Sequence, residues 1–78
     1  MYLVIYDISD PRRLRKTGRF MQRYGRRVQK SVFECRLKRS AYRAMLYGLS
    51  AIAEENDSIM IYALPERIVE EKIMICCL

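Results

Sequence analysis

Hydrophobic side chains occur in uninterrupted runs at three places along the chain, and the length of each run predicts a β-strand. Residues 1–8 are β-branched, aromatic or aliphatic apart from Asp7, and are apolar on both faces. Residues 58–64 form a second run, which is followed by proline, and residues 73–78 form a third after a charged segment. We expect the first two runs to be buried strands and the third to be an edge strand.

A fourth segment, residues 26–38, alternates between apolar and polar side chains, as a strand with one covered face does. The alternation changes phase near Lys30 and Ser31. A phase change of this kind indicates either one long strand with a bend or two short strands. The pattern does not fix the position of a turn.

Apolar residues with helical spacing follow Asp10, which predicts a helix that is capped by this residue and continues to Tyr24, before Gly25. Proline at the first helical position strengthens the start signal. The residues on the apolar arc are Leu14, Thr17, Gly18, Phe20, Met21 and Tyr24. The residues on the opposite arc are all basic: Arg12, Lys16, Arg19 and Arg23.

A second helical pattern predicts a helix that is capped by Ser40 and ends near Glu54. The residues on its buried face are Tyr42, Met45, Leu46, Leu49, Ile52 and Ala53. The resulting order is β-α-β-β-α-β with an extra C-terminal edge strand. This order is typical of the ferredoxin-like α+β sandwich, in which both helices cover one face of the sheet.

The chain has 78 residues, which predicts a single domain over residues 1–78 with a small hydrophobic core. The uncovered face of the sheet is apolar, so we expect two copies to form a homodimer through it. Residues 66–78 form a C-terminal segment, and an edge strand exchanged between the two copies is one arrangement open to it.

Charge is divided very unevenly along the chain. Residues 1–43 contain thirteen Lys and Arg against three Asp and Glu, whereas residues 44–78 contain two against six. Nine basic residues and no acidic residue lie between Pro11 and Phe33. Such a segment can be an ordinary solvated surface, but its density favours contact with a phosphate backbone.

The candidate nucleic-acid-binding residues are Arg12, Arg13, Arg15, Lys16, Arg19, Arg23, Arg26 and Arg27. We expect Arg13, Arg15 and Arg27 to be the best phosphate contacts. The guanidinium group matches the geometry of phosphate oxygens, and the neighbouring sequence offers no acid to compete for it.

The residue types that are present restrict the chemistry. The chain has no histidine, and its three cysteines include no Cys-x-x-Cys pair, which argues against zinc sites and histidine-based catalysis. The cysteines indicate reduced thiols in the cytoplasm, and no signal peptide or membrane span is predicted. Any catalysis must therefore use carboxylates, hydroxyls or a hard metal ion. Asp7 stands at the end of the first strand, where an Asp either forms an Asx-turn or binds such a metal.

Several segments taken together resemble one known family. They are the strand end Tyr6-Asp7-Ile8, Ser9-Asp10 with the basic helix after it, Tyr24-Gly25, the run Arg27-Val28-Gln29-Lys30-Ser31-Val32-Phe33-Glu34-Cys35, and residues 57–65. Over residues 1–65 the chain resembles the CRISPR-associated Cas-two family. The tail is shorter than in most members of that family.

The resemblance implies a homodimer that bridges dimers of the Cas-one integrase and holds the duplex DNA of an incoming spacer. It also implies, as for some relatives, a magnesium-dependent endonuclease that acts on RNA or DNA, with Asp7 as the catalytic and metal-binding residue. One Mg²⁺ per dimer would lie between the two Asp7 side chains, because one carboxylate per chain is too few. Tyr6, Ser31 and Phe33 match family positions near this site.

Two further interpretations share the predicted fold. One is a free module of the RRM type that binds single-stranded RNA, although the chain lacks the Gly-aromatic run of that class in a central strand. The other is a toxin ribonuclease of the VapD kind. A scaffold that binds DNA without cutting it and a nuclease both remain open within the family interpretation.

Overall fold

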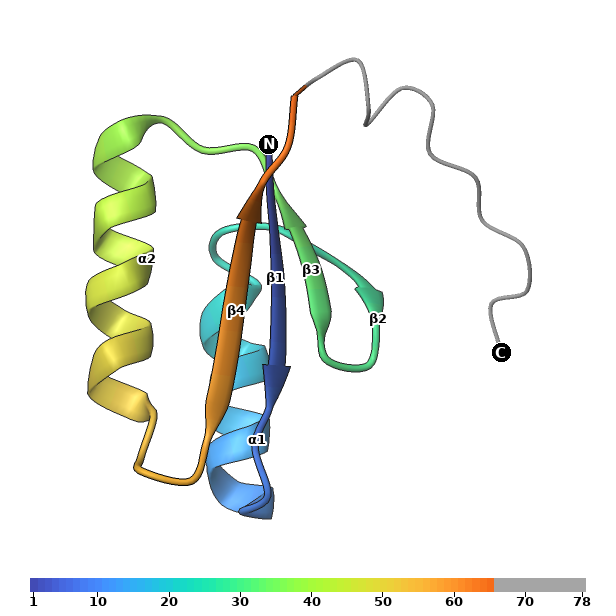
Figure 1. Ribbon diagram of the computed structural model, residues 1–78, viewed down its shortest axis with the longest axis vertical. Coiled ribbons are helices and arrows are strands. Elements are labelled where there is room, and N and C mark those ends of the chain that lie inside the picture. Colours follow the sequence, from blue (N-terminus) through green and yellow to red (C-terminus); the bar gives the residue numbers. More distant parts are fainter. Residues whose placement is uncertain (66–78) are drawn as a thin grey trace.

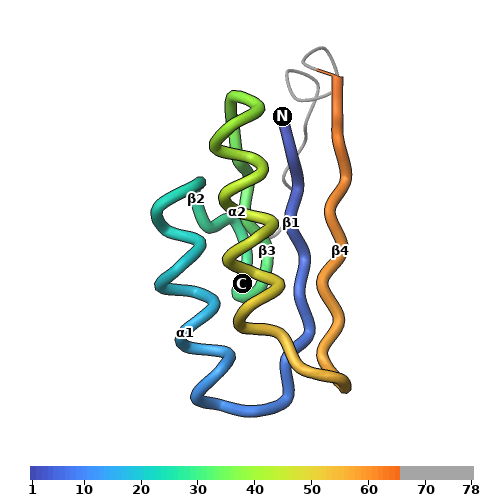
Figure 2. The backbone as a smooth tube through the Cα atoms, turned by 90° about the vertical axis from the view of Figure 1, so that its left-hand side faces the viewer, coloured from blue at the N-terminus to red at the C-terminus, as the bar shows by residue number. Residues whose placement is uncertain are grey.

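The structure is a computed structural model, which describes residues 1–65 (Figure 1). Its elements are β1 (Tyr2–Asp7), α1 (Pro11–Met21), β2 (Arg26–Gln29), β3 (Val32–Cys35), α2 (Arg39–Ile52) and β4 (Ser58–Ala63). The strands form one antiparallel sheet in the order β2-β3-β1-β4. Both helices lie on the same side of it (Figure 2). The ferredoxin-like fold is therefore confirmed, while the strand expected at 73–78 and the whole segment 66–78 lie outside the described residues.

The phase change in residues 26–38 has two structural causes. The β2–β3 ladder shifts register between Arg27 and Gln29, as a β-bulge does, and the chain then turns at Lys30 and Ser31. The segment is thus two short strands joined as a hairpin, and this settles the alternative that the sequence left open.

Helix α1 begins as predicted. The Asp10 side chain accepts a hydrogen bond from the Arg13 amide at 2.9 Å, and Pro11 occupies the first helical position. The helix ends at Met21 rather than at the predicted Tyr24, because the amide of Tyr24 donates to the Met21 carbonyl in a tighter turn. The Gly25 amide donates to the same carbonyl at 3.1 Å, and the chain then enters β2.

Helix α2 begins earlier than predicted, and the expected cap at Ser40 is wrong. The cap position is Lys38, which forms no side-chain capping bond, and Ser40 lies inside the first turn. The helix phase is fixed by packing instead, since the ring of Tyr42 stacks on that of Tyr2 at 4.1 Å and Leu37 packs against the core. Tertiary contacts here override the capping preference.

The core lies between the helices and the inner face of the sheet. Its buried apolar members are Val4, Tyr6, Ile8, Met21, Phe33, Cys35, Met45 and Leu49. The buried polar residue Thr17 donates its hydroxyl to the Arg13 carbonyl at 2.8 Å, so burial leaves that hydroxyl with a partner.

The prediction that residues 58–64 form a buried strand holds for only one face of β4, which lies at the edge of the described sheet. Ile59 and Ile61 pack against the core, whereas Met60 and Tyr62 are each 47% exposed on the other face. The apolar run of residues 58–64 therefore has two different faces. One packs on the core, and the other is also apolar but is not covered by any element within residues 1–65.

Candidate nucleic-acid interface and carboxylate site

The basic stripe comprises Arg12, Lys16 and Arg19 of α1 and Arg23 in the turn that follows it, and all four residues are exposed. None of the four forms an ion pair with a carboxylate among residues 1–65. Arg15 is exposed and unpaired within the same range. The stripe is therefore a row of cations whose charge is open to solvent and to anions.

Three residues of the stripe border an open depression between α1 and α2. The depression has a volume of about 320 Å³, and its lining residues are Lys16, Arg19, Phe20, Arg23 and Ile52. No carboxylate is among them. The Arg23 guanidinium lies 6.0 Å from the centroid of the Phe20 ring, which is within reach of a cation–π interaction.

Arg13 differs from the stripe, and the expectation that no acid competes for it is wrong. Its Nε and Nη2 atoms donate to the two carboxylate oxygens of Asp57 at 2.9 and 3.1 Å. Its Nη1 atom lies 3.5 Å from Glu54 and 3.9 Å from Asp10. The sequence could not show this, because Asp57 is 44 positions away and reaches Arg13 only through the fold.

The carboxylate of Asp57 is held in its charged form. Its side chain has no solvent exposure, and it accepts a third hydrogen bond from the Glu54 amide at 2.9 Å. The hydrogen bonds from Arg13, and after them the bond from the Glu54 amide, hold the pKa of Asp57 below its ordinary value. The hydrogen bonds that the Arg13 guanidinium donates to Asp57 raise the pKa of Arg13.

Arg26 and Arg27 extend the basic surface onto β2, but both have intramolecular contacts. Arg26 lies 3.2 Å from Glu34 across the hairpin. The Arg27 guanidinium lies 5.2 Å from the centroid of the Phe33 ring. It also occupies the space that a side chain at Gly18 would need. Arg27 has no carboxylate partner among the described residues, in agreement with the expectation that no acidic side chain competes with phosphate for it.

Asp7 is exposed at the end of β1, opposite Ser58 in the ladder. Its side chain forms no hydrogen bond or ion pair with any other of residues 1–65. Within these residues no three carboxylate or thiol side chains come together as a metal site would require. Among residues 1–65, Asp7 is thus a lone carboxylate at this strand end, whereas Mg²⁺ is usually held by one or two carboxylates together with phosphate oxygens and water.

Of the residues predicted to lie near Asp7, Tyr6 precedes it in β1, while Ser31 and Phe33 belong to the turn before β3 and to β3 itself, the strand that pairs with β1. Tyr6 and Phe33 are buried on the helix-covered side of the sheet, with ring centroids 6.3 Å apart. Burial raises the pKa of Tyr6, and the nearby Arg27 charge partly opposes the shift. Ser31 accepts a hydrogen bond from the Tyr6 amide through its carbonyl. Since strand side chains alternate, Asp7 points to the opposite face from Tyr6.

The face of the sheet that carries Asp7 is largely apolar in its centre. Directly paired residues of antiparallel strands share a face, and the register places Leu3 between Glu34 and Tyr62 and Ile5 between Val32 and Met60. No helix of residues 1–65 covers this face (Figure 2). We refer to its five apolar residues, Leu3, Ile5, Val32, Met60 and Tyr62, as the open sheet patch.

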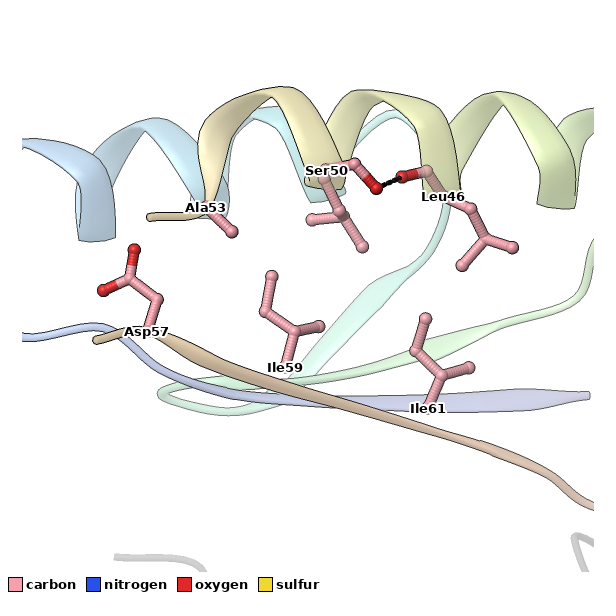
Figure 3. A pocket seen from close by; sticks show the side chains of 7 residues that line it. Leu46, Ser50, Ala53, Asp57, Ile59 and Ile61 are labelled. Atoms are coloured by element: carbon pink, nitrogen blue, oxygen red, sulfur yellow. Dashed lines mark hydrogen bonds between the residues drawn. The ribbon is translucent and has the colours of Figure 1, made fainter. Parts of the chain in front are cut away.

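A further hollow, which the sequence did not indicate, lies between α2 and β4 (Figure 3). It has a volume of about 250 Å³ and is lined by Leu46, Leu49, Ser50, Ala53, Asp57, Ile59 and Ile61. Its polar groups are already engaged, because the Ser50 hydroxyl donates to the Leu46 carbonyl at 2.8 Å and Asp57 is bound by Arg13. The hollow therefore offers apolar surface and no free hydrogen-bonding group to a small polar ligand.

No helix among residues 1–65 has the length and apolar character needed to cross a bilayer.

Comparison with known proteins agrees with this geometry. Residues 1–72 match the family model described as CRISPR associated protein Cas2. A protein of Synechocystis sp. named CRISPR-associated endoribonuclease Cas2 3 is 42% identical over 65 residues, which cover 82% of this chain and 71% of that protein. A Halalkalibacterium halodurans protein named CRISPR-associated endonuclease Cas2 is 40% identical over 70 residues, which cover 82% and 73%.

The crystal structure of Streptococcus pyogenes Cas2 at pH 6.5 superposes with a TM-score of 0.87 at 32% identity and covers 96% of this chain and 98% of that one. Sequence and structure comparisons thus lead to the same group of proteins, the family that the motif in residues 27–35 resembles. The chain belongs to the CRISPR-associated Cas2 family.

Proposed function

We propose that this protein is a cytoplasmic subunit of CRISPR spacer acquisition, which binds duplex DNA as a homodimer and bridges dimers of the Cas-one integrase. The observation that supports DNA binding is the basic stripe of α1, with its exposed cations free of carboxylate partners among residues 1–65. Family membership favours this role over the RRM-type and VapD-type interpretations.

The dimensions of the stripe suit a phosphate backbone. Arg12 and Arg19 are seven residues apart within α1, which corresponds to about 10 Å along the helix. Phosphates of one DNA strand are spaced about 3.4 Å apart along the helix axis, so the stripe spans several of them. Contacts of this kind position a duplex without reading its sequence, which is what a protein that accepts any spacer needs.

The open sheet patch supports the homodimer. Met60 and Tyr62 are each 47% exposed, and they adjoin Leu3 and Ile5 on the same face. A small domain gains stability by covering such a surface with a second copy, and a two-fold axis brings the same patch of both chains together. Each copy has one exposed Asp7 side chain, which lies at the end of this face.

A second candidate activity is magnesium-dependent cleavage of RNA or DNA. It is favoured by the unpaired Asp7 carboxylate and by relatives whose names are endoribonuclease and endonuclease. Two Asp7 side chains would hold one Mg²⁺ between two copies, and they would repel each other without it. A magnesium ion bound there would polarise a phosphate oxygen and so assist phosphodiester hydrolysis.

The test of DNA binding compares two double charge reversals on different helices. Arg19→Glu/Arg23→Glu alters the stripe, and Arg39→Glu/Arg43→Glu makes the same change in charge on exposed positions of α2. We expect the stripe variant to bind a random-sequence duplex at least tenfold more weakly, measured by fluorescence anisotropy, with a much smaller effect of the α2 variant. Equal losses in both variants would show that net charge rather than the stripe governs binding.

A further inference from the structure

Arg13 contacts two segments that flank Asp7. One is the turn that follows β1, where Asp10 accepts a hydrogen bond from the Arg13 backbone amide and lies 3.9 Å from Nη1 of the Arg13 guanidinium. The other is the loop before β4, where Asp57 accepts both forks of the Arg13 guanidinium at 2.9 and 3.1 Å. The bond to Asp57 spans 44 positions of sequence, so it fixes tertiary rather than local structure.

The Asp57 carboxylate depends on this arginine. It has no solvent exposure, and its remaining bond comes from the Glu54 amide within the same loop. The described residues contain no buried side-chain nitrogen or oxygen without a hydrogen-bond partner. Removing the guanidinium would leave a buried carboxylate without its cation, which is strongly unfavourable. The loop from Glu54 to Asp57 is therefore held against α1 by one side chain.

The position of Asp7 follows from these two attachments. Ser58, which directly follows Asp57, is the register partner of Asp7 at the end of the β1–β4 ladder. Asp10 stands three residues after Asp7 on the other side. Both backbone segments that border Asp7 thus contact Arg13, one through its backbone amide and a 3.9 Å ion pair and the other through its guanidinium. Asp7 itself has no side-chain bond to fix it within residues 1–65.

We propose that Arg13 and Asp57 form a clamp that positions Asp7, and that Arg13 makes no contact with the bound nucleic acid. Arg13 is then a positioning residue, in contrast to its neighbours Arg12 and Arg15, whose cations are unpaired among the described residues. Lysine cannot replace it, because an ammonium group cannot donate two parallel hydrogen bonds to one carboxylate. The part of the proposal that concerns Asp7 as a metal-binding residue rests on the proposed function.

The first test measures whether Arg13 neutralises a phosphate. The logarithm of the duplex-binding constant falls with the logarithm of salt concentration, with a slope of about 0.9 for each phosphate neutralised. We expect Arg12→Gln to reduce the slope by about one and Arg13→Gln to leave it unchanged. A reduction by Arg13→Gln equal to that by Arg12→Gln would overturn the claim that Arg13 is withdrawn from the interface.

The second test measures the position of Asp7 without any enzyme assay. Amide hydrogen exchange at Asp7 and Ser58 should become faster in Arg13→Lys and in Asp57→Asn, with exchange in the β2–β3 hairpin unchanged. Added Mn²⁺ alone should broaden the NMR signal of Asp7 in the parent protein and should broaden it less in Arg13→Lys. Unchanged exchange at both residues in both variants would overturn the clamp.

If a single variant does not fold, Arg13→Gln/Asp57→Asn removes both charges together and leaves no buried carboxylate without a partner. We expect this double variant to fold, with the parent salt slope and with faster exchange at Asp7. Failure of the proposed function gives a different result. If neither Arg12→Gln nor Arg19→Glu/Arg23→Glu changes duplex binding, the stripe is not the interface, and hydrogen exchange still decides whether the clamp exists.

Discussion

The ring of Phe20 occupies the space that a side chain on Gly48 would need. Helices α1 and α2 therefore meet through an aromatic side chain of one and the bare backbone of the other. Phe20 also contacts Tyr24, with ring centroids 5.1 Å apart, and it lies in the depression below the basic stripe. Phe20 thus both packs between the two helices and borders the surface that carries the basic stripe.

We expect Gly48→Ala to destabilise the protein. Alanine is ordinarily favoured over glycine inside a helix by about 0.5–1 kcal/mol. Here the new methyl group collides with the Phe20 ring, and overpacking of this kind costs about 1–3 kcal/mol. Urea denaturation should show a lower free energy of unfolding. In a Phe20→Ala background the collision is absent, so there Gly48→Ala should be neutral or stabilising. A more stable Gly48→Ala protein in the parent background would contradict the packing described.

The open sheet patch predicts how the oligomeric state responds to charge. Met60→Lys/Tyr62→Lys places two cations in the surface proposed to be buried between copies, so we expect the dimer dissociation constant to rise at least tenfold, or about 1.4 kcal/mol. Sedimentation equilibrium measures this directly. Tyr47→Lys is the control, because Tyr47 is 82% exposed on α2 and lies outside the patch. A dimer that both variants leave equally stable would place the interface elsewhere.

Asp7→Asn distinguishes the two proposed activities, duplex DNA binding and magnesium-dependent cleavage. The substitution preserves size and removes the charge, so it should abolish magnesium-dependent cleavage while dimerisation and duplex binding remain nearly unchanged. Chelation of divalent ions should reproduce the loss in the parent protein. Undiminished cleavage by a rigorously purified Asp7→Asn protein would indicate a contaminating nuclease. Spacer integration that survives the substitution would show that cleavage is not what the protein contributes to acquisition.

Cys35 should be unreactive in the folded protein. Its side chain is buried, and burial raises the pKa of the thiol from 9.0 to about 11. Below pH 9 the thiol is neutral in both states. Between about pH 9 and 11 the unfolded chain ionises first, and stability falls as pH rises. Alkylation followed by mass spectrometry of the Cys35 peptide should show labelling only after denaturant is added. Cys35→Ala should weaken the alkaline loss of stability.

The sequence predicted correctly those features of α1 that depend on residues close together in the chain. The apolar arc of α1 around Thr17 and Met21 is buried, and its basic arc is exposed, because a single helical face determines both. The Asp10 cap was predictable for the same reason, since its partner, the Arg13 amide, is three residues away. The alternation in residues 26–38 predicted strand structure there, but it did not distinguish one bent strand from two short strands.

What the sequence could not predict depends on contacts between distant residues. The withdrawal of Arg13 into an ion pair required knowledge of where Asp57 lies in the fold. The stacking of Tyr42 on Tyr2 fixed the start of α2 in place of the expected cap. The exposure of Met60 depends on which face of the sheet the helices cover among residues 1–65, and a strand that is apolar on both faces does not show this.

The pairing of β1 with β4 has a consequence for folding during synthesis. Tyr2 pairs with Ala63, and the carbonyl of Met1 accepts a hydrogen bond from the Leu64 amide, so the first strand completes its ladder only with the last one described. A nascent chain that has not yet released residues 58–63 from the ribosome holds an apolar β1 with one edge unpaired. Loop closure over nearly the whole described chain then precedes the final ladder, which is slow compared with local pairing. Until that step β1 is open to pairing with other chains, and chaperones that protect exposed strands would act in this interval.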